Sequence, residues 1–246
     1  SFIDNTDRAT TFSNMKNYFL RKDNDLEICS HRTNSIARFI RFSAILNCME
    51  IDVIIENDYL DVSHSKKEST SLKLVDLIKI QKDKNDILWL DVKNIQSTEQ
   101  CIKLMNHLKN INLKNNQIKL FIEFPSKIIN EISNYKECIS NIRLMNFPIS
   151  YYIPNNVKSK CIEEEKLNNS DEKSCKYTNE IIQKIYESSL FTDLSFDYKN
   201  YDYLKNINQI DKFTLNTWHI PDQEIMSISD KNFRLVIPYN DDVNYN

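Results

Sequence analysis

Four short patterns in the first hundred residues combine histidines, carboxylates and basic side chains, which are the groups that carry acid–base and metal chemistry. They are His31-Arg32, Glu50-Ile51-Asp52, His64 and Asp91-Val92-Lys93. Residues two apart in a β-strand point to the same side, so Glu50 and Asp52 must face together. Two carboxylates in so apolar a strand are costly unless their charge is compensated. A hard divalent cation, Mg²⁺ or Ca²⁺, bound by the carboxylate oxygens would provide that compensation.

A structural ion cluster is the alternative interpretation of the acidic pattern. In that cluster Glu50 and Asp52 would pair with Lys93 and Arg32 and hold no metal. Each acidic pair taken alone favours this interpretation. The combination is more specific, because the chain has only four histidines and two of them, His31 and His64, fall beside the acidic patterns. The set as a whole therefore indicates a functional site.

The rest of the chain supplies the elements that must position these groups. Apolar, β-branched or aromatic runs alternate with helical patterns, and several runs are continuous, as in parallel strands covered on both faces. The predicted strands are Leu26–His31, Met49–Ile55, Ile87–Lys93, Ile118–Phe124, Ile149–Pro154, Leu194–Tyr198, Phe213–Trp218 and Phe233–Pro238. The helix that follows the first strand is expected to start at Asn34 or Ser35 and to bury Ile36, Phe39, Ile40 and Ala44.

Eight strand–helix units in 246 residues match the size of a (β/α)8 barrel, which has about 250 residues. We therefore predict a single α/β domain over 1–246 with this TIM-barrel fold. It carries an N-terminal extension at 1–24 and a polar loop at 155–176. An open doubly wound sheet is the alternative. Active sites of such barrels lie at the carboxyl ends of the strands, where the four patterns are expected to meet.

Composition excludes several classes of site. Glycine is absent from all 246 residues. Phosphate-binding glycine loops, dinucleotide fingerprints and the nucleophile elbow of serine hydrolases all need glycine, so they are excluded. The 32 basic and 35 acidic residues leave a net charge of −3, without a basic block interleaved with aromatics, so no nucleic-acid partner is expected. Apolar runs stay well short of the roughly 18 residues of a membrane span, so no transmembrane segment is expected.

The six cysteines leave the compartment open, with the cytoplasm slightly favoured over export. They form no Cys-x-x-Cys pair, which argues against a structural zinc site. Cys29, Cys48 and Cys101 lie among apolar residues and are expected to act as small buried hydrophobes. Cys161 and Cys175 flank a polar stretch and are a possible disulfide.

The joint pattern resembles the glycerophosphodiester phosphodiesterase superfamily, which includes the spider-venom phospholipase D (sphingomyelinase D) enzymes and the menorin-like proteins. The resemblance covers residues 26–95 closely and extends weakly to Trp218. The runs Cys-Ser-His-Arg-Thr-Asn-Ser-Ile and Trp-Leu-Asp-Val-Lys-Asn look closest to the menorin-like and related bacterial branches. The resemblance implies a barrel fold and a metal-dependent phosphodiesterase.

The resemblance also implies a role for each matching residue. Glu50, Asp52 and Asp91 match the carboxylates that hold one Mg²⁺ or Ca²⁺. His31 matches the base or nucleophile, and His64 the general acid that protonates the leaving oxygen. Arg32 and Lys93 match the cations that stabilise the phosphoryl oxygens.

This sequence departs from the family pattern at three points. Thr33 stands where the family has glycine after His-Arg, so a reshaped first loop and a narrower pocket are expected. Asp91 is shorter than the glutamate often found there and would draw the metal toward its strand, as in the venom branch. The segment from Glu56 to Asp61 is too short for an inserted subdomain, which favours the compact branches.

Further polar and aromatic residues near the strand ends are candidates for substrate binding. Trp218 would stack on a substrate group or fill the barrel mouth, and Glu123 would contact substrate or pair with a buried cation. Asn94 is the third candidate. His107 is expected to be a solvated helix residue. His219 follows the seventh strand and would either reach the site or be a loop histidine without a role, and the second interpretation is favoured.

Three functions are compatible with these residues. The first is a phosphodiesterase with His/His acid–base catalysis that cleaves a glycerophosphodiester, a phospholipid or a phosphodiester-linked surface polymer, with a cyclic phosphate as one route. The second is a non-catalytic barrel that binds a phosphate-bearing lipid or glycan head group or a partner protein. The third, a carbohydrate-active barrel with Asp52 and Asp91 as its acid pair, leaves Lys93 and both histidines without a task. The oligomeric state is left open.

Overall fold

A computed structural model describes residues 26–81, 85–114, 118–168, 175–225, 228 and 232–238. Within them, eight parallel strands form a closed barrel: β1 (Glu27–Ser30), β2 (Cys48–Ile55), β4 (Ile87–Val92), β5 (Lys119–Phe124), β6 (Ile149–Tyr152), β7 (Asp193–Asp197), β8 (Thr214–Ile220) and β9 (Phe233–Pro238). Parallel pairing of β1 with both β9 and β2 closes the ring. The predicted TIM-barrel fold is therefore confirmed, and each predicted strand overlaps an observed one with its ends shifted by at most two residues. The predicted extension at 1–24 lies outside the described residues.

A short hairpin is added to the barrel at the carboxyl end of β2. Strand β3 (Leu60–Val62) pairs antiparallel with Val53–Ile55, and the turn between the two strands spans only 56–59. The structure thus has no room for a subdomain at this point. The hairpin returns the chain to the barrel mouth, so that His64 follows β3 after one intervening residue.

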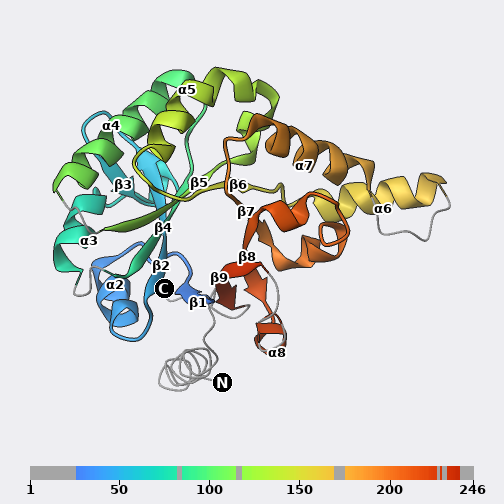
Figure 1. The fold of residues 1–246 in the computed structure, drawn as a ribbon. Coiled ribbons are helices and arrows are strands. Elements are labelled where there is room, and N and C mark those ends of the chain that lie inside the picture. The colour runs from blue at the N-terminus through green and yellow to red at the C-terminus, as the bar shows by residue number, and fades with distance from the viewer. Residues whose placement is uncertain are drawn as a thin grey trace.

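Helices alternate with the strands and cover the outside of the barrel, as Figure 1 shows. They are α2 (Ile36–Ser43), α3 (Leu74–Ile80), α4 (Thr98–Lys114), α5 (Ile132–Arg143), α6 (Val157–Asn168), α7 (Lys176–Ser188) and the single turn α8 (Asp222–Ile225). Four 3₁₀ helices complete the described elements: η1 (Lys66–Glu68), η2 (Ser126–Glu131), η3 (Tyr198–Tyr203) and η4 (Ile210–Lys212). Figure 1 also shows α6 reaching out from the barrel beside α7.

Helix α2 begins as predicted but buries a different face. The Ser35 side chain caps it by accepting a hydrogen bond from the Arg38 backbone N–H. Phe39 and Phe42 are buried, whereas Ile36 and Ile40 are each 47% exposed and Ala44 is exposed too, so the predicted face is wrong except for Phe39. The helix has apolar residues on two sides, and packing selects the side with the larger aromatic rings.

The predicted polar loop at 155–176 is largely helical. Residues 157–168 form α6 and α7 begins at Lys176, while 169–174 lie outside the described residues. The sequence of α6 consists mainly of polar and charged residues and has little apolar periodicity. For this reason its pattern favours a loop over a helix. Cys161 and Cys175 tie the start of α7 to α6 through a disulfide, as the sequence suggested.

All six cysteines lie within the described residues and all are paired. Cys29 is bonded to Cys48 and Cys101 to Cys138. The expected burial of Cys29, Cys48 and Cys101 is confirmed, but the sequence analysis did not expect them to form disulfides. All of these cysteines lie among apolar side chains. The fold brings the two members of each pair together although they are 19 and 37 residues apart in the sequence.

The barrel interior forms a small core of its own. Cys29, Cys48, Trp89, Phe121, Leu235 and Ile237 pack together there, separate from the larger core between strands and helices. Because side chains alternate along a strand, the residues two positions further along β2 and β4 from Cys48 and Trp89 also point inward. Those residues are Glu50 and Asp91, so this apolar plug forms the floor below them.

Candidate active site

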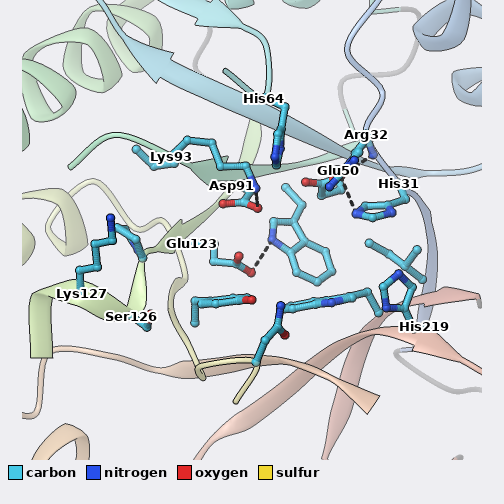
Figure 2. Close-up of a pocket in the computed structure, with 17 residues that line it drawn as sticks. His31, Arg32, Glu50, His64, Asp91, Lys93, Glu123, Ser126, Lys127 and His219 are labelled. Carbon is cyan, nitrogen blue, oxygen red and sulfur yellow. Dashed lines mark hydrogen bonds and ion pairs between the residues drawn. The ribbon is translucent and has the colours of Figure 1, made fainter. Parts of the chain in front are cut away.

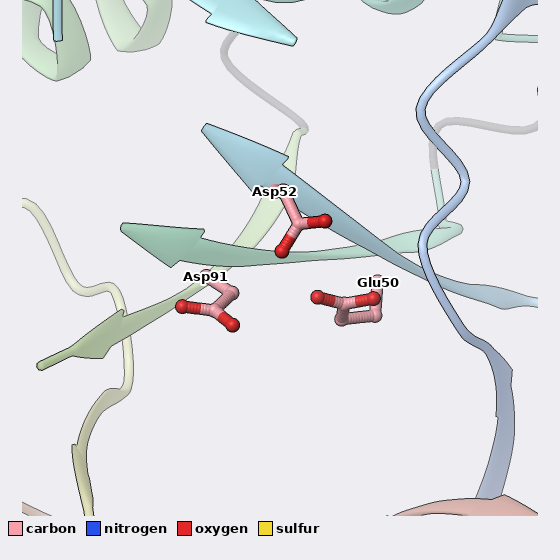
Figure 3. A group of neighbouring side chains, drawn as sticks. All are labelled: Glu50, Asp52 and Asp91. Atoms are coloured by element: carbon pink, nitrogen blue, oxygen red, sulfur yellow. The ribbon is translucent and has the colours of Figure 1, made fainter. Parts of the chain in front are cut away.

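Glu50, Asp52 and Asp91 meet at the mouth of the barrel. Each offers one carboxylate oxygen, and the three oxygens lie within 4.8 Å of one another (Figure 3). Strands β2 and β4 place them there, since Asp52 is the direct register partner of Asp91. Glu50 is 3% exposed and Asp52 fully buried, and the two carboxylates face together, as predicted, at the inner side of the barrel. Three carboxylate oxygens at this spacing are the donor set that Mg²⁺ and Ca²⁺ prefer.

Lys93 is the cation inside this cluster. Its ammonium lies 2.8 Å from Asp52 Oδ1 and forms a second ion pair with Asp91. Burial alone would lower the pKa of Lys93, but the charges of Asp91, Asp52 and Glu50 outweigh burial and raise it. Lys93 is therefore a permanent positive charge that offsets part of the negative charge of the three acids.

The three carboxylates differ in their readiness to ionise. Burial and the neighbouring charges of Asp52 and Asp91 raise the pKa of Glu50 well above its ordinary value. Burial also raises the pKa of Asp91 against the opposing effect of Lys93. Burial would do the same to Asp52, but the nearby His64 and Lys93 hold its pKa below 3.8. One acid of the cluster is thus fully ionised, and the other two hold protons more tightly than usual, which a bound cation would reverse.

His31 and His64 approach this cluster from different elements. His31 follows β1, and its Nε2 lies 3.9 Å from Glu50 Oε2, whereas His64 follows β3, and its Nδ1 lies 3.4 Å from Asp52 Oδ2. Figure 2 shows both rings pointing into one pocket, with Glu50 between them. The sequence-predicted pair of histidines is thus brought to a shared cavity with one carboxylate neighbour each.

Arg32 contributes more through its backbone than the sequence suggested. Its φ of 48° lies in the left-handed region, and its N–H donates a hydrogen bond to Glu50 Oε2. The next residue, Thr33, turns its hydroxyl to Ser30 Oγ at 2.6 Å and is fully buried, while its N–H donates to the Glu50 carbonyl. The loop therefore accommodates threonine at the glycine position by packing its side chain beneath the loop. The exposed Arg32 side chain remains at the pocket rim.

Asn34 is a site residue that the sequence analysis assigned only to helix capping. Its Nδ2 donates to Asp52 Oδ2 at 2.6 Å, and its Oδ1 accepts from the Asp52 backbone N–H at 2.9 Å. These two hydrogen bonds fix both the backbone and the carboxylate of Asp52, the acid of the cluster whose pKa is lowered. The position of Asn34, three residues after His31, was the available signal for a site residue. The capping pattern of Asn34 and Ser35 instead suggested a role at the start of the helix.

Aromatic side chains form one wall of the pocket, which has a volume of about 480 Å³. Trp218 stacks on Tyr152, with ring centroids 5.2 Å apart and an interplanar angle of 4°. Trp89 Nε1 donates to Glu123 Oε2 at 3.0 Å, and burial together with the charge of Asp91 raises the pKa of Glu123 well above 4.5. Trp218 and Glu123 therefore do lie at the pocket, where Ser126 and Lys127 also reach its edge (Figure 2).

Asn94 has a structural task away from the pocket. Its amide accepts a hydrogen bond from the Ile55 N–H and donates one to the Ile55 carbonyl, at 2.8 and 3.0 Å. Both amide atoms are thereby committed to the end of β2, and Asn94 is not among the pocket residues. The structure therefore gives no support to its predicted contact with substrate.

The two remaining histidines differ from their expected roles. His107 is partly buried on α4, with its Nε2 3.1 Å from the Glu56 carbonyl, so it packs against the β2–β3 turn and is not a solvated residue. His219 lines the pocket, and its Nδ1 lies 3.1 Å from Asp197 Oδ2. The predicted loop position is therefore wrong, because His219 belongs to β8 and reaches the pocket.

Comparison with known proteins adds little to this geometry. No family model and no curated protein matches the chain. Among solved structures, the crystal structure of a chitinase from Chromobacterium violaceum ATCC 12472 is similar, with a TM-score of 0.46 and 9% sequence identity. The match covers 78% of this chain and 68% of the chitinase chain. Similarity at this level carries no information about the chemistry of the pocket.

Proposed function

We propose that this protein is a metal-dependent phosphodiesterase of the glycerophosphodiester phosphodiesterase type. The observation that carries the proposal is the meeting of Glu50, Asp52 and Asp91 within 4.8 Å, with an imidazole next to Glu50 and another next to Asp52. Its substrate is a glycerophosphodiester, a phospholipid or a phosphodiester-linked polymer. A phosphodiester is an anion, so its negative charge must be neutralised and its leaving oxygen protonated during attack at phosphorus.

The three carboxylates would hold one Mg²⁺ or Ca²⁺, whose chemistry is to neutralise the phosphoryl oxygens and polarise the P–O bonds. Lys93 adds a fixed positive charge between Asp52 and Asp91, and Arg32 adds an exposed one at the rim. Asn34 and the Arg32 N–H hold two of the carboxylates in place. The chain thereby supplies a preorganised environment for a dianionic transition state.

His31 and His64 would carry the protons. Imidazole titrates near working pH, so one ring can accept the proton of the attacking group while the other protonates the leaving oxygen. In this proposal His31 is the base on the Glu50 side, and His64 is the acid on the Asp52 side. The stacked pair Trp218 and Tyr152 offers a flat apolar surface to whatever group the phosphate bears.

We further infer that the protein works in an oxidising compartment. Three disulfides join its six cysteines. Such bonds form and persist in oxidising environments and are rare in the cytosol. This inference replaces the slight preference for the cytoplasm drawn from the sequence. Within the described residues, no helix has the length and apolar character needed to cross a bilayer.

A panel of phosphodiesters incubated with purified protein and Mg²⁺ or Ca²⁺ tests the proposal, with products followed by ³¹P NMR. We expect turnover that chelation abolishes and that His64→Ala reduces by a factor of about 100 or more, the usual contribution of a general acid or base. On a substrate with a neighbouring hydroxyl, His31→Ala should reduce formation of the cyclic phosphate by a similar factor. His107→Gln is the matched control, because His107 lies outside the pocket. Binding of a phosphodiester that survives both chelation and His64→Ala, without turnover, would instead identify a non-catalytic binding barrel.

A further inference from the structure

His219 enters the pocket through an irregularity in β8. Trp218 and His219 are consecutive, yet both line the pocket, whereas consecutive residues of a regular strand point to opposite faces. The pairing of β8 with β9 shifts register between Thr217 and Ile220, and His219 has a φ of 57°. Bulges and left-handed non-glycine residues of this kind cost energy and commonly re-aim a side chain beside an active site. The irregularity therefore brings a third imidazole to the cavity.

The carboxylate of Asp197 orients this imidazole. It ends β7, is 4% exposed, and is the register partner of Trp218. Its Oδ2 lies 3.1 Å from His219 Nδ1, and the Lys199 N–H and ammonium lie 3.2 and 3.1 Å from its carboxylate. Burial would raise the pKa of Asp197, but His219 and Lys199 outweigh burial and lower it. An ionised carboxylate accepts from Nδ1–H, which fixes the ring and its tautomer, so that Nε2 is the basic nitrogen of His219.

The third imidazole lies beside His31. The two ring centroids are 5.9 Å apart in an edge-to-face arrangement, whereas His64 is placed at Asp52. Figure 2 shows His31 and His219 on one side of the pocket and His64 apart from them. Two imidazoles thus lie at one side of the pocket and one lies apart from them. A single base and a single acid suffice for one displacement, so the second base needs a task of its own.

We propose that His219, positioned by Asp197, is the base that activates a water molecule for direct hydrolysis of the phosphodiester. This inference rests on the proposed function. A water O–H bond breaks and its proton passes to His219 Nε2, while the water oxygen forms a bond to phosphorus. The P–O bond to the leaving group breaks, and that oxygen takes a proton from His64. Solvent then accepts the proton from His219 and returns one to His64, so a diester and water give a monoester and an alcohol.

His31 has a different reaction in this scheme. It takes the proton of a hydroxyl on the substrate itself, whose oxygen forms a bond to phosphorus while the P–O bond to the leaving group breaks. The leaving oxygen takes a proton from His64, so the products are a cyclic phosphate and an alcohol. The two neighbouring bases therefore decide between two products: His31 favours the cyclic phosphate and His219 the monoester. Asp197 acts only through His219 and is a positioning residue.

Two substrates separate these reactions. Glycerophosphoethanolamine carries a hydroxyl next to its phosphodiester and can react by either route, whereas bis(4-nitrophenyl) phosphate has no hydroxyl and can only be hydrolysed. For His219→Gln we expect a loss of about tenfold or more in kcat on bis(4-nitrophenyl) phosphate, with KM little changed, because a base acts in the transition state. On glycerophosphoethanolamine, ³¹P NMR should show the cyclic share of product rising at the expense of glycerol phosphate.

Two further variants distinguish a catalytic role from a structural one. Asp197→Asn should move the product ratio in the same direction, and added imidazole should restore hydrolysis in His219→Ala but not in His64→Ala. Near-ultraviolet circular dichroism should match the wild type in each variant. His107→Gln should leave the ratio unchanged.

The outcomes separate this inference from the function beneath it. A wild type that turns over neither substrate overturns the proposed function and this inference with it. An active wild type whose product ratio is unchanged in His219→Gln, or whose two reactions fall equally and are not rescued by imidazole, overturns the role of His219 alone. A shifted ratio with imidazole rescue supports it.

Discussion

Replacing Glu50 by glutamine should remove the effect of a divalent cation without weakening the fold of the metal-free protein. Glu50 is 3% exposed, and burial together with Asp52 and Asp91 raises its pKa, so its ionised form is already disfavoured in the absence of metal. Glutamine has the same shape, and its carbonyl can still accept the hydrogen bond that the Arg32 N–H donates to Oε2. The substitution therefore removes a ligand charge but no packing.

The size of the cation effect follows from mass action. A cation at 100 times its Kd stabilises the folded state by about 2.7 kcal/mol, which for a chain of this length raises Tm by roughly 5–10 °C. Metal binding must displace the protons that the raised pKa values of Glu50 and Asp91 retain, so the shift should grow as pH increases. Differential scanning fluorimetry with Mg²⁺, with Ca²⁺ and after chelation measures it.

Glu123→Gln is the matched control for this experiment. Glu123 is a buried acid of the same pocket with a raised pKa, but it lies outside the cluster of three carboxylates. The control should keep the cation-induced shift in Tm, whereas Glu50→Gln should lose it while its metal-free Tm stays at or above that of the wild type. A wild type that responds to neither cation, or a shift that survives in Glu50→Gln, would refute the metal site.

Three other substitutions test separate parts of the structure. Replacing Cys29 and Cys48 together by alanine removes a cross-link over 19 residues and should cost about 3 kcal/mol of unfolding free energy, measured by urea denaturation; an unchanged midpoint would contradict the pairing. Asn34→Ala leaves the Asp52 backbone N–H and carboxylate without their shared partner and should cost about 1–3 kcal/mol, with a matching rise in the cation concentration needed for half-maximal stabilisation. Because the pKa of Glu123 is raised on folding, its folded form retains a proton that the unfolded form releases, so wild-type stability should decline as pH rises above 4.5; Glu123→Gln should flatten that decline, and parallel pH profiles for the two proteins would show that Glu123 ionises normally.

The barrel and the shared face of Glu50 and Asp52 could be predicted because both follow from short-range periodicity. Alternation along a strand puts the two carboxylates on one side. The addition of Asp91 was implied by the family resemblance, and in the structure parallel pairing of β2 with β4 in register brings it alongside. The continuous apolar runs of the strands likewise identify a sheet covered on both faces. Such rules need only the order of residues along the chain.

The features that were missed depend on contacts or on broken periodicity. His219 points into the pocket because a register shift interrupts β8, and no sequence pattern marks that shift in a chain without glycine. The pairing of Cys29 with Cys48 depends on the closure of β1 onto β2, which composition does not reveal. Ile36 and Ile40 looked as apolar as Phe39, and only the packing of α2 on the barrel decides which of them is buried.

The placement of the indole rings has a practical consequence for solution work. The chain has two tryptophans, and both line this one pocket, with Trp89 beside Glu123 and Trp218 stacked on Tyr152. Intrinsic emission excited at the red edge of the indole band therefore originates entirely from the barrel mouth. Occupancy of the cavity can be titrated optically, without a label, in the same cuvette as a cation titration.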